Sequence, residues 1–420
     1  MEYGLIGGRL GHSYSKLIHE MLCGYRYDLC PLPTEADARA FLEKRAFKAI
    51  NVTLPYKRLV MEYCSFIDPR AKAIGAVNTV VNHNGLLYGY NTDYLGFAHL
   101  CAAHSVDFTG RTVLILGTGG THNTTSAVAR DKGAAKILTV SRKPDPAKGE
   151  LSYEEAVHSG AQIVINTTPA GMYPNVGTCN LDIAAMPGLE AVLDVVYNPE
   201  KTEIILRAEE AGVPVAASGL EMLVAQAVYA VEYFLGRKFE DAPAEISRVT
   251  AVIRRDTLNV VLIGMPSSGK STIGRMLAEK LGKRFLDLDD EVVKADGRTI
   301  PEIFAAEGED SFRRKETEQT ARFAKEGRQL LSCGGGVIKR PENIRLLHQN
   351  GVILFLDRPL EALTVGGGRP LSSSTDALRA MYTERRPLYL AAADAVVPNH
   401  TTVTDAVNAA MEALDEIFDH

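Results

Sequence analysis

The chain has 420 residues, of which 46% are hydrophobic and 23% are charged, and its net charge is −6. This length predicts two or three globular domains, since one domain takes roughly 150 residues. The slightly acidic balance excludes the overall positive field that attracts nucleic acids or anionic membranes, so anionic substrates must be bound by local basic or amide-rich pockets.

Six cysteines are scattered along the chain without a CxxC pair. This spacing argues against a structural zinc site or a disulfide framework and is typical of buried thiols in a reducing compartment. The N-terminal stretch MEYGLIGGRLGHSYS lacks the basic and apolar regions of a signal peptide, and no apolar run approaches the roughly 18 residues of a membrane span. We therefore expect a soluble, cytoplasmic protein.

Short apolar runs alternate with helical patterns, which predicts an α/β fold with mainly parallel strands. In the first hundred residues we expect strands at 3–7, 48–54 and 76–81 and helices near 16–24 and 35–44. From residue 112 the alternation becomes regular and indicates a Rossmann-type series. Its predicted strands are 112–117, 136–141, 162–168 and 191–197, and its predicted helices lie near 121–132 and 153–158.

Two long helices, 219–236 and 242–253, precede a fresh α/β series. That series is predicted to contain strands at 259–264, 285–290, 329–333 and 352–357, a helix at 270–281, a glycine-rich loop at 366–374 and terminal helices. The predicted domains are a substrate domain at 1–104 completed by the helices of 219–253, a Rossmann domain at 105–218, a linker at 254–258 and a phosphate-loop domain at 259–420.

The turn GTGGT at 117–121 ends a predicted strand and begins a helix. Its glycines would let the backbone approach a pyrophosphate lying at the helix N-terminus. His122 occupies the place of the third glycine of G-x-G-x-x-G, so a tight strand–helix turn without a nucleotide is the alternative to a dinucleotide site. The next strand ends in Ser141, Arg142 and Lys143, and these cations favour the 2′-phosphate of NADP, although a solvated basic strand end has the same composition.

Two loops carry a candidate acid–base pair. Lys57 ends the stretch NVTLPYK, and Asp93 ends GYNTD, which we expect to be a loop after a strand. Brought together, they could exchange a proton with a carbonyl or alcohol, which typically contributes about 10²–10⁴-fold to the rate. Neutral hydrogen-bonding groups accompany them, at Ser13, Ser15, Asn51, Thr53, Asn78 and Asn91. Such groups would suit a substrate with several hydroxyls and one carboxylate.

These stretches together resemble shikimate dehydrogenase over residues 3–235. HSYS, NVTLPYK, GAVNT, GYNTD, GTGGT, INTTPAGM, DVVYNP and GLEMLVAQA occur in the family's order. The resemblance implies that Lys57 and Asp93 are the catalytic pair, with Lys57 polarising or protonating the C3 oxygen as NADPH delivers hydride. The chain departs from the family at Lys16, where proline is usual, and after the glycine turn, at Thr121, His122 and Asn123.

The same resemblance implies the remaining site residues of the first half. Substrate contacts are implied for Ser13 and Ser15, at the carboxylate, and for Thr53, Asn78 and Gln226, at the hydroxyls or in support of the pocket. Positions implied around the cofactor or the domain cleft are Gly117, Gly119, Gly120, Ser141, Arg142, Lys143, Thr167, Met172, Tyr197, Gly219 and Met222.

The stretch GMPSSGKST at 264–272 matches G-x-x-x-x-G-K-[ST] between a strand and a helix, the context that a phosphate loop requires. Lys270 would reach the β- and γ-phosphates, and Ser271 would bind Mg²⁺. The predicted nucleotide-binding residues are Pro266, Ser267, Ser268, Gly269, Lys270, Ser271 and Thr272. The motif alone predicts an NTPase or a kinase and leaves the substrate open.

Three further stretches bear on that substrate. In FLDLDDE, Asp287 and Asp289 are predicted to alternate to one side of a strand, so that one could organise Mg²⁺ and the other accept a hydroxyl proton. The arginine pairs of SFRRKE and ERRPLY match planar carboxylates, although part of these charges could be ordinary surface residues. The three glycines of SCGGGV would let the backbone approach a ring closely.

These stretches are similar to shikimate kinase over about 258–418, where the phosphate loop, DLD, FRR, CGGG, GRPL and RRPLY occur in family order. The resemblance implies a phosphate-loop domain of the nucleoside monophosphate kinase type. The implied roles are Mg²⁺ binding for Ser271 and Asp287, deprotonation of the shikimate 3-hydroxyl for Asp289, carboxylate binding for Arg313 and Arg385, ring contacts for Gly334, Gly335 and Gly336, and lid closure over the phosphate for Arg369. The family's arginine upstream in the lid is absent here.

Together the resemblances imply a bifunctional enzyme that reduces 3-dehydroshikimate with NADPH and phosphorylates shikimate with MgATP. One alternative is an NAD-linked quinate/shikimate oxidoreductase fused to a kinase, which Arg142 and Lys143 disfavour. A second is a ligand-binding regulator with one inactive half, which the presence of proton-transfer residues such as Lys57 and Asp289 disfavours. Partners are expected to be small molecules, without nucleic acid or membrane, and the sequence does not predict the oligomeric state.

Overall fold

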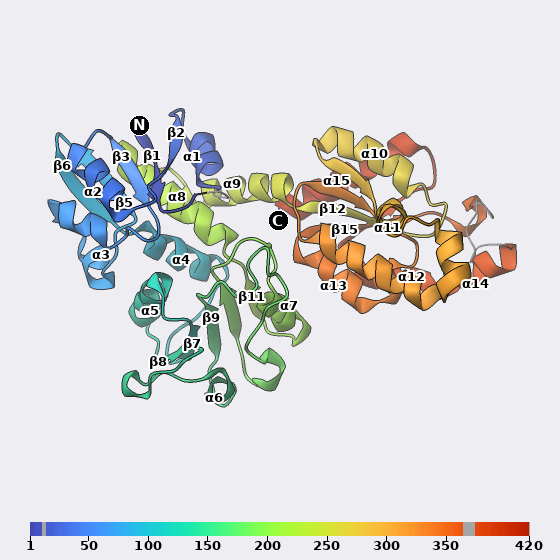
Figure 1. Ribbon diagram of the computed structural model, residues 1–420, viewed down its shortest axis with the longest axis horizontal. Helices are drawn as coiled ribbons and strands as arrows, with labels where there is room; N and C mark the ends of the chain where they lie inside the picture. The colour runs from blue at the N-terminus through green and yellow to red at the C-terminus, as the bar shows by residue number, and fades with distance from the viewer. Residues whose placement is uncertain (11–13, 364–373, 420) are drawn as a thin grey trace. The chain divides into compact units, whose positions relative to one another are not determined.

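A computed structural model describes residues 1–10, 14–363 and 374–419 of the chain (Figure 1). The chain divides into two compact units, Met1–Tyr197 with Thr202–Thr250, and Asn198–Lys201 with Ala251–His420. Each unit is built on mainly parallel sheets that helices cover, so the expectation of an α/β fold is confirmed. None of the described helices has the length and apolar character needed to cross a membrane.

The first unit begins with a six-stranded sheet in the order β2-β1-β3-β5-β6-β4. Its strands are β1 (Tyr3–Gly7), β2 (Tyr27–Pro31), β3 (Ala49–Val52), β4 (Phe66–Ile67), β5 (Thr79–His83) and β6 (Leu86–Tyr90). β1 lies parallel to β2 and β3, whereas β5 runs antiparallel to both β3 and β6. Consequently the ends of β1, β3 and β6 and the beginning of β5 lie along one edge of the sheet.

Helices cover both faces of this sheet. They are α1 (Ser15–Leu22), α2 (Glu35–Lys44) and α3 (Pro69–Ile74), with a 3-10 segment η1 (Leu59–Tyr63). Ile50 and Val52 of β3 pack with Leu42 of α2 on one face. On the other face, Ala49 packs with Phe234 of α8 (Leu220–Leu235).

The second sheet of this unit is entirely parallel, in the order β11-β10-β9-β7-β8. Its strands are β7 (Thr112–Leu116), β8 (Lys136–Val140), β9 (Ile163–Asn166), β10 (Ala191–Asp194) and β11 (Val215–Ala217). Its other elements are α5 (Gly120–Asp131), η2 (Pro146–Lys148), α6 (Tyr153–Val157), η3 (Ile183–Ala185) and α7 (Glu203–Glu210). The fully buried runs of β9 and β10 are what a parallel sheet covered on both faces requires.

Helix α4 (Thr92–Ala103) packs closely against α8, and both lie between the two sheets of the first unit (Figure 1). Gly96 makes this approach possible, because a Cβ there would lie 2.6 Å from the carbonyl oxygen of Met222 and 3.0 Å from the Cβ of Gln226. Phe97 of α4 is fully buried beside this contact. The helix pair therefore fixes the first turn of α4 relative to the middle of α8.

The second unit contains a five-stranded parallel sheet in the order β13-β14-β12-β15-β16. Its strands are β12 (Asn259–Ile263), β13 (Arg284–Asp287), β14 (Gln329–Ser332), β15 (Gly351–Asp357) and β16 (Ala395–Pro398). Helices α10 (Lys270–Leu281) and α15 (Val403–Asp419) cover one face. The other elements are α11 (Leu288–Asp296), α12 (Ile300–Ala324), η4 (Val337–Lys339), α13 (Pro341–Gln349), η5 (Leu360–Ala362) and α14 (Thr375–Ala392), and Phe323, Leu347 and Tyr389 of α12, α13 and α14 pack on the opposite face.

Several element boundaries differ from those predicted. Helix α9 runs from Ala242 to Thr257, four residues beyond its predicted end, so most of the predicted linker at 254–258 is helical. The strand predicted at 285–290 ends at Asp287, because the side chain of this residue accepts the Asp289 N–H and caps α11. Asp93 lies in the first turn of α4 rather than in a loop, because Asn91 caps that helix through the N–H of Tyr94.

Replacement of Gly96 by alanine is expected to destabilise the first unit by about 1–3 kcal/mol, the usual cost of overpacking. The added Cβ can be accommodated only if α4 and α8 move apart. Calorimetric unfolding of the full chain measures the effect. Gly24→Ala is the matched control, because a Cβ at Gly24 would meet no atom within 4 Å. Equal unfolding midpoints for the two variants would show that the helix contact is not tight.

Candidate active sites

The first unit contains a cavity of about 410 Å³ at the edge where β1 and β3 end and α4 and α8 begin. The predicted site residues that line it are Ser15, Thr53, Lys57, Asn78, Asp93, Tyr197, Gly219, Met222 and Gln226. Ser13, which the resemblance places at the substrate carboxylate, lies outside the described residues. The lining side chains are a mixture of apolar groups, hydroxyls, amides and charges, which suits a small polar ligand.

Lys57 and Asp93 form an ion pair in this cavity, with 2.7 Å between Nζ and Oδ2. The two side chains are 21% and 18% exposed, so the pair is accessible to a small ligand while being largely shielded from bulk water. Lys57 is held by its backbone, since its carbonyl accepts the Val77 N–H at 2.9 Å. Asp93 is held by the capped first turn of α4. This geometry allows a proton to pass between the pair and a ligand oxygen.

Buried amides connect the start of α4 to the first sheet. Asn78 Oδ1 accepts the Thr92 N–H at 2.7 Å, and Asn51 Nδ2 donates to Thr79 Oγ1 at 3.1 Å. Asn51 Oδ1 in turn accepts the Tyr27 hydroxyl at 2.8 Å. Both asparagines also line the cavity. Asn78 therefore fixes the turn of α4 that carries Asp93, and both asparagines present polar atoms to a ligand.

The glycine turn lies at the end of β7, on the same edge as the ends of β8 and β9. Gly117 has a φ of 100°, and a Cβ there would lie 3.1 Å from Thr167 Oγ1, so only glycine fits. At Gly119 and Gly120, which precede and begin α5, a Cβ would meet no atom within 4 Å. The helix N-terminus is thus open to a ligand, which fits the pyrophosphate of a dinucleotide.

The other predicted cofactor residues lie away from the cavity wall. Arg142 and Lys143 are exposed after β8, and Ser141 accepts the N–H of Lys143 in the same turn. Met172 is 45% exposed. Among the described polar residues that line the cavity, Arg9 and Thr121 were not predicted as site residues. Thr121 follows the glycine turn directly, whereas Arg9 belongs to no motif that would have identified it.

The second unit contains a cavity of about 650 Å³ at the carboxyl ends of β12, β13 and β14. The predicted residues that line it are Pro266, Ser267, Gly269, Lys270, Ser271, Thr272, Asp287, Asp289, Arg313, Gly334, Gly335, Gly336 and Arg385. Ser268 is fully buried behind the loop, where its carbonyl accepts Asn399 Nδ2 at 2.7 Å. Arg369, predicted in the lid, lies outside the described residues.

The phosphate loop joins β12 to α10. Ser267 and Gly269 have φ values of 65° and 89°, and Lys270 is the first residue of the helix. Lys270 Nζ donates to the carbonyls of Gly264 at 3.0 Å and Met265 at 2.9 Å. The lysine is therefore bent back over its own loop, in the position from which it can reach a bound phosphate.

Ser271 and Asp287 supply a hydroxyl and a carboxylate 2.7 Å apart, and Ser332 Oγ donates to the same carboxylate oxygen at 3.1 Å. Asp287 and Asp289 both line the cavity, although the strand alternation predicted for them is wrong because α11 starts between them. The described residues contain no cluster of three or more His, Cys, Asp or Glu side chains suited to a metal. A hydroxyl and one carboxylate nevertheless fit Mg²⁺, which usually binds few protein groups together with phosphates and water.

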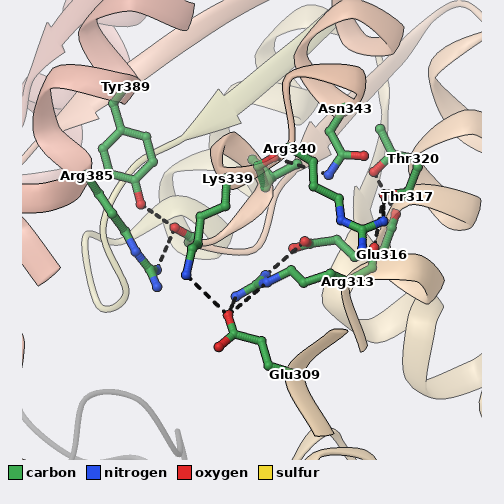
Figure 2. Close-up of polar contacts among 12 residues, drawn as sticks. Glu309, Arg313, Glu316, Thr317, Thr320, Lys339, Arg340, Asn343, Arg385 and Tyr389 are labelled. Atoms are coloured by element: carbon green, nitrogen blue, oxygen red, sulfur yellow. Dashed lines mark hydrogen bonds and ion pairs between the residues drawn. The ribbon is translucent and has the colours of Figure 1, made fainter. Parts of the chain in front are cut away.

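Arg313 lies between two glutamates of its own helix (Figure 2). Its Nη1 donates to Glu316 at 2.8 Å, and its Nε and Nη2 donate to Glu309 at 3.2 and 3.1 Å. Lys339 Nζ lies 3.5 Å from the same oxygen of Glu309. The guanidinium is only 8% exposed. Its orientation is therefore determined by the protein before any ligand binds.

Arg385 enters the same cavity from α14. Its Nη1 donates to the Gly335 carbonyl at 2.9 Å, and the Tyr389 hydroxyl donates to the same oxygen (Figure 2). The neighbouring Arg386 instead pairs with Asp357, 2.7 Å away. Of Arg385 and Arg386, only Arg385 faces the cavity. Together with Arg313, it places two guanidinium groups on the cavity wall.

Glu316 lines the cavity but was not predicted from the sequence. Burial raises the pKa of this carboxyl to about 7, an effect that Arg313 only partly offsets. One of its oxygens, Oε1, has no hydrogen-bond partner among the described residues. Glu316 thus changes charge near neutral pH at a place where an anionic ligand is expected.

The first unit has the architecture of a dinucleotide-linked oxidoreductase, and the second has that of a phosphate-loop kinase. Residues 5–80 match the family model of the shikimate dehydrogenase substrate binding domain. A shikimate dehydrogenase (NADP(+)) of Clostridium beijerinckii is 36% identical over 244 residues, 55% of this chain and 90% of that protein. The chain therefore belongs to the shikimate dehydrogenase family.

Solved structures agree with this assignment. A chorismate mutase/shikimate 5-dehydrogenase fusion protein from Clostridium acetobutylicum has a TM-score of 0.56 and 30% identity, covering 60% of this chain and 96% of its own. Shikimate 5-dehydrogenase from Thermus thermophilus, solved in complex with NADP(H) and shikimate, has a TM-score of 0.53 and 28% identity, covering 60% and 98%. Residues 266–415 match the shikimate kinase family model. The predicted fusion of the two families is confirmed.

A pH dependence follows from Glu316. Below about pH 7 this side chain is neutral, and above it a negative charge opposes an anionic substrate beside Arg313. We expect the KM for shikimate in the kinase reaction to rise about 3- to 10-fold between pH 6 and pH 8, since one charge interaction is worth about that factor. In Glu316→Gln this rise should disappear. Glu318→Gln, an exposed position on the same helix, is the control, and identical profiles in all three proteins would refute the role.

Proposed function

We propose that this chain catalyses two consecutive reactions, NADPH-dependent reduction of 3-dehydroshikimate to shikimate and ATP-dependent phosphorylation of shikimate to shikimate 3-phosphate. The observation that carries the proposal is the presence of both families in one chain, because the product of one reaction is the substrate of the other. The cavity of the first unit is lined by Lys57 and Asp93 and that of the second by Lys270 and Asp289, which supports the proposal.

In the first reaction, Lys57 donates a hydrogen bond, and then a proton, to the C3 oxygen of 3-dehydroshikimate. Asp93 accepts a second hydrogen bond from the same ammonium group and so keeps that group directed at the C3 oxygen. Asn78, Thr53 and Gln226 line the surrounding wall and can orient the ring hydroxyls. The glycine turn would hold NADPH, Arg142 and Lys143 would be available to its 2′-phosphate, and the bound cofactor would supply the hydride that adds to C3.

In the second reaction, Asp289 accepts the proton of the shikimate 3-hydroxyl as that oxygen attacks the γ-phosphorus of ATP, the bond from this phosphorus to the β,γ-bridging oxygen breaks, and ADP leaves. Arg313 and Arg385 hold the substrate carboxylate, and Gly334, Gly335 and Gly336 form the wall beside the ring, where a Cβ at Gly334 would come within 2.4 Å of Asp289 Oδ1. Lys270 reaches the β- and γ-phosphates. Ser271 and Asp287 would hold Mg²⁺, which would neutralise charge on the phosphates.

Both reactions use small, highly polar metabolites, so we place the enzyme in the cytoplasm with small-molecule partners. We propose that residues 1–104 with 219–253 bind the substrate of the first reaction and that residues 105–218 bind NADP. Residues 259–420 are proposed to catalyse the kinase reaction. Arg369 is proposed as the arginine that closes over the transferring phosphate.

A coupled assay tests the whole proposal. Purified protein supplied with 3-dehydroshikimate, NADPH and MgATP is expected to oxidise NADPH and then to release ADP, as followed by absorbance at the nicotinamide band and by a separate ADP readout. NADH in place of NADPH should be used less well because of Arg142 and Lys143. Loss of one signal while its nucleotide still binds would identify that unit as a binding domain.

Substitutions in the two sites should separate the activities. Lys57→Ala is expected to lower dehydrogenase kcat by about 10²–10⁴-fold, the usual worth of general acid–base catalysis, and to leave kinase activity unchanged. Asp289→Asn is expected to lower the kinase kcat by a similar factor and to leave dehydrogenase activity unchanged. The controls are Lys48→Ala, whose side chain is 61% exposed, and Asp290→Asn, the exposed neighbour of Asp289. A loss of both activities in either variant would mean that the units are coupled, and a near-normal rate would remove that residue from proton transfer.

A further inference from the structure

We propose that Arg9 binds the carboxylate of the dehydrogenase substrate and so determines the preference of this site for a carboxylate-bearing ring. The inference rests on the proposed function, because it assigns a ligand group to the same cavity. Arg9 is an exposed residue that lines the cavity next to Leu10 and Ser15.

The backbone around Arg9 is fixed against the strand end that carries the reactive loop. Gly8, its neighbour, donates its N–H to the Leu54 carbonyl at 3.0 Å, and the Thr53 N–H donates to the Ile6 carbonyl at 2.9 Å. A Cβ at Gly7 would lie only 2.5 Å from Thr53 Cγ2. The backbone of Arg9 therefore has a defined position two residues beyond this close contact, so little backbone conformational entropy is lost when a ligand binds.

Arg9 carries a positive charge on the cavity wall that no neighbouring carboxylate among the described lining residues neutralises. The charged side chains among the described lining residues are Arg9, Lys57 and Asp93. Lys57 and Asp93 neutralise each other across 2.7 Å. No hydrogen bond or ion pair joins Arg9 to another described residue. Among these residues, the net charge that an entering ligand meets is therefore positive, and Arg9 is its source.

The chain as a whole is anionic, with a net charge of −6, so a guanidinium at this place gives an anionic ligand a local positive charge. Ser15 and Thr53 offer neutral hydroxyls, whereas the guanidinium fork matches a carboxylate with two charge-assisted hydrogen bonds, each about twice as strong as a neutral one. A phosphate of the dinucleotide has related chemistry, and the experiment below separates the two anions.

The test is steady-state kinetics of full-length Arg9→Met and Arg9→Lys with 3-dehydroshikimate and NADPH, with calorimetric unfolding of the same polypeptide as the measure of a folded first unit. Arg9→Met is expected to raise the KM for 3-dehydroshikimate about 10-fold with little change in kcat, since it removes binding common to ground state and transition state. Arg9→Lys should retain part of the affinity. The increase of KM with added NaCl should be weaker in Arg9→Met than in the wild type.

Arg26→Met is the matched control, because Arg26 lies in the same unit, pairs with Asp28 and has a side chain that is 84% exposed. A second probe, the methyl ester of 3-dehydroshikimate, should have similar KM values with wild type and Arg9→Met. An unchanged KM in Arg9→Met, or a rise confined to NADPH, would overturn the proposal. Failure of the wild type to reduce 3-dehydroshikimate at all would instead refute the proposed function.

Discussion

The parallel arrangement of strands is the constraint that brings the glycine turn of the first unit and the phosphate loop of the second unit to the edge of a sheet. In a parallel sheet all carboxyl ends lie along one edge, so residues distant in sequence meet there. In the second unit this edge brings together the phosphate loop after β12, Asp287 at the end of β13 and Gly334 after β14. In the second sheet of the first unit it collects Gly117 and Thr167 after β7 and β9.

The first sheet reaches the same result with mixed strand directions. β5 runs antiparallel to β3, so its start, at Thr79, lies beside the end of β3, and β6 then returns to the same edge before Asp93. Lys57 and Asp93 are therefore 36 residues apart in sequence but 2.7 Å apart in space. The close contact of α4 with α8 at Gly96 completes the wall from the opposite side.

The sequence predicted those residues that directly follow strands, because short apolar runs and the glycine motifs after them are local signals. It failed where a side chain ends or begins an element. Asn91 and Asp287 are helix caps, and an asparagine or aspartate looks the same in a loop, so Asp93 and Asp289 were assigned to the wrong kind of element. Glu316 and Arg9 were missed for another reason: their roles depend on which groups surround them in space, and neither lies in a distinctive local pattern.

The arginines proposed to bind the substrate carboxylate lie in different solvent environments in the two units. Arg313 is buried between Glu309 and Glu316, and these carboxylates offset the cost of removing its charge from water while reducing the attraction left for a ligand. The burial that raises the pKa of Glu316 lessens that reduction, because a neutral Glu316 returns positive charge to the site. Arg9 is exposed, so its charge has a small desolvation cost, but salt screens its attraction for a ligand. The same carboxylate would thus be held by a pH-sensitive contact in the kinase site and by a salt-sensitive one in the dehydrogenase site, so that changes in solution conditions alter the two consecutive steps independently.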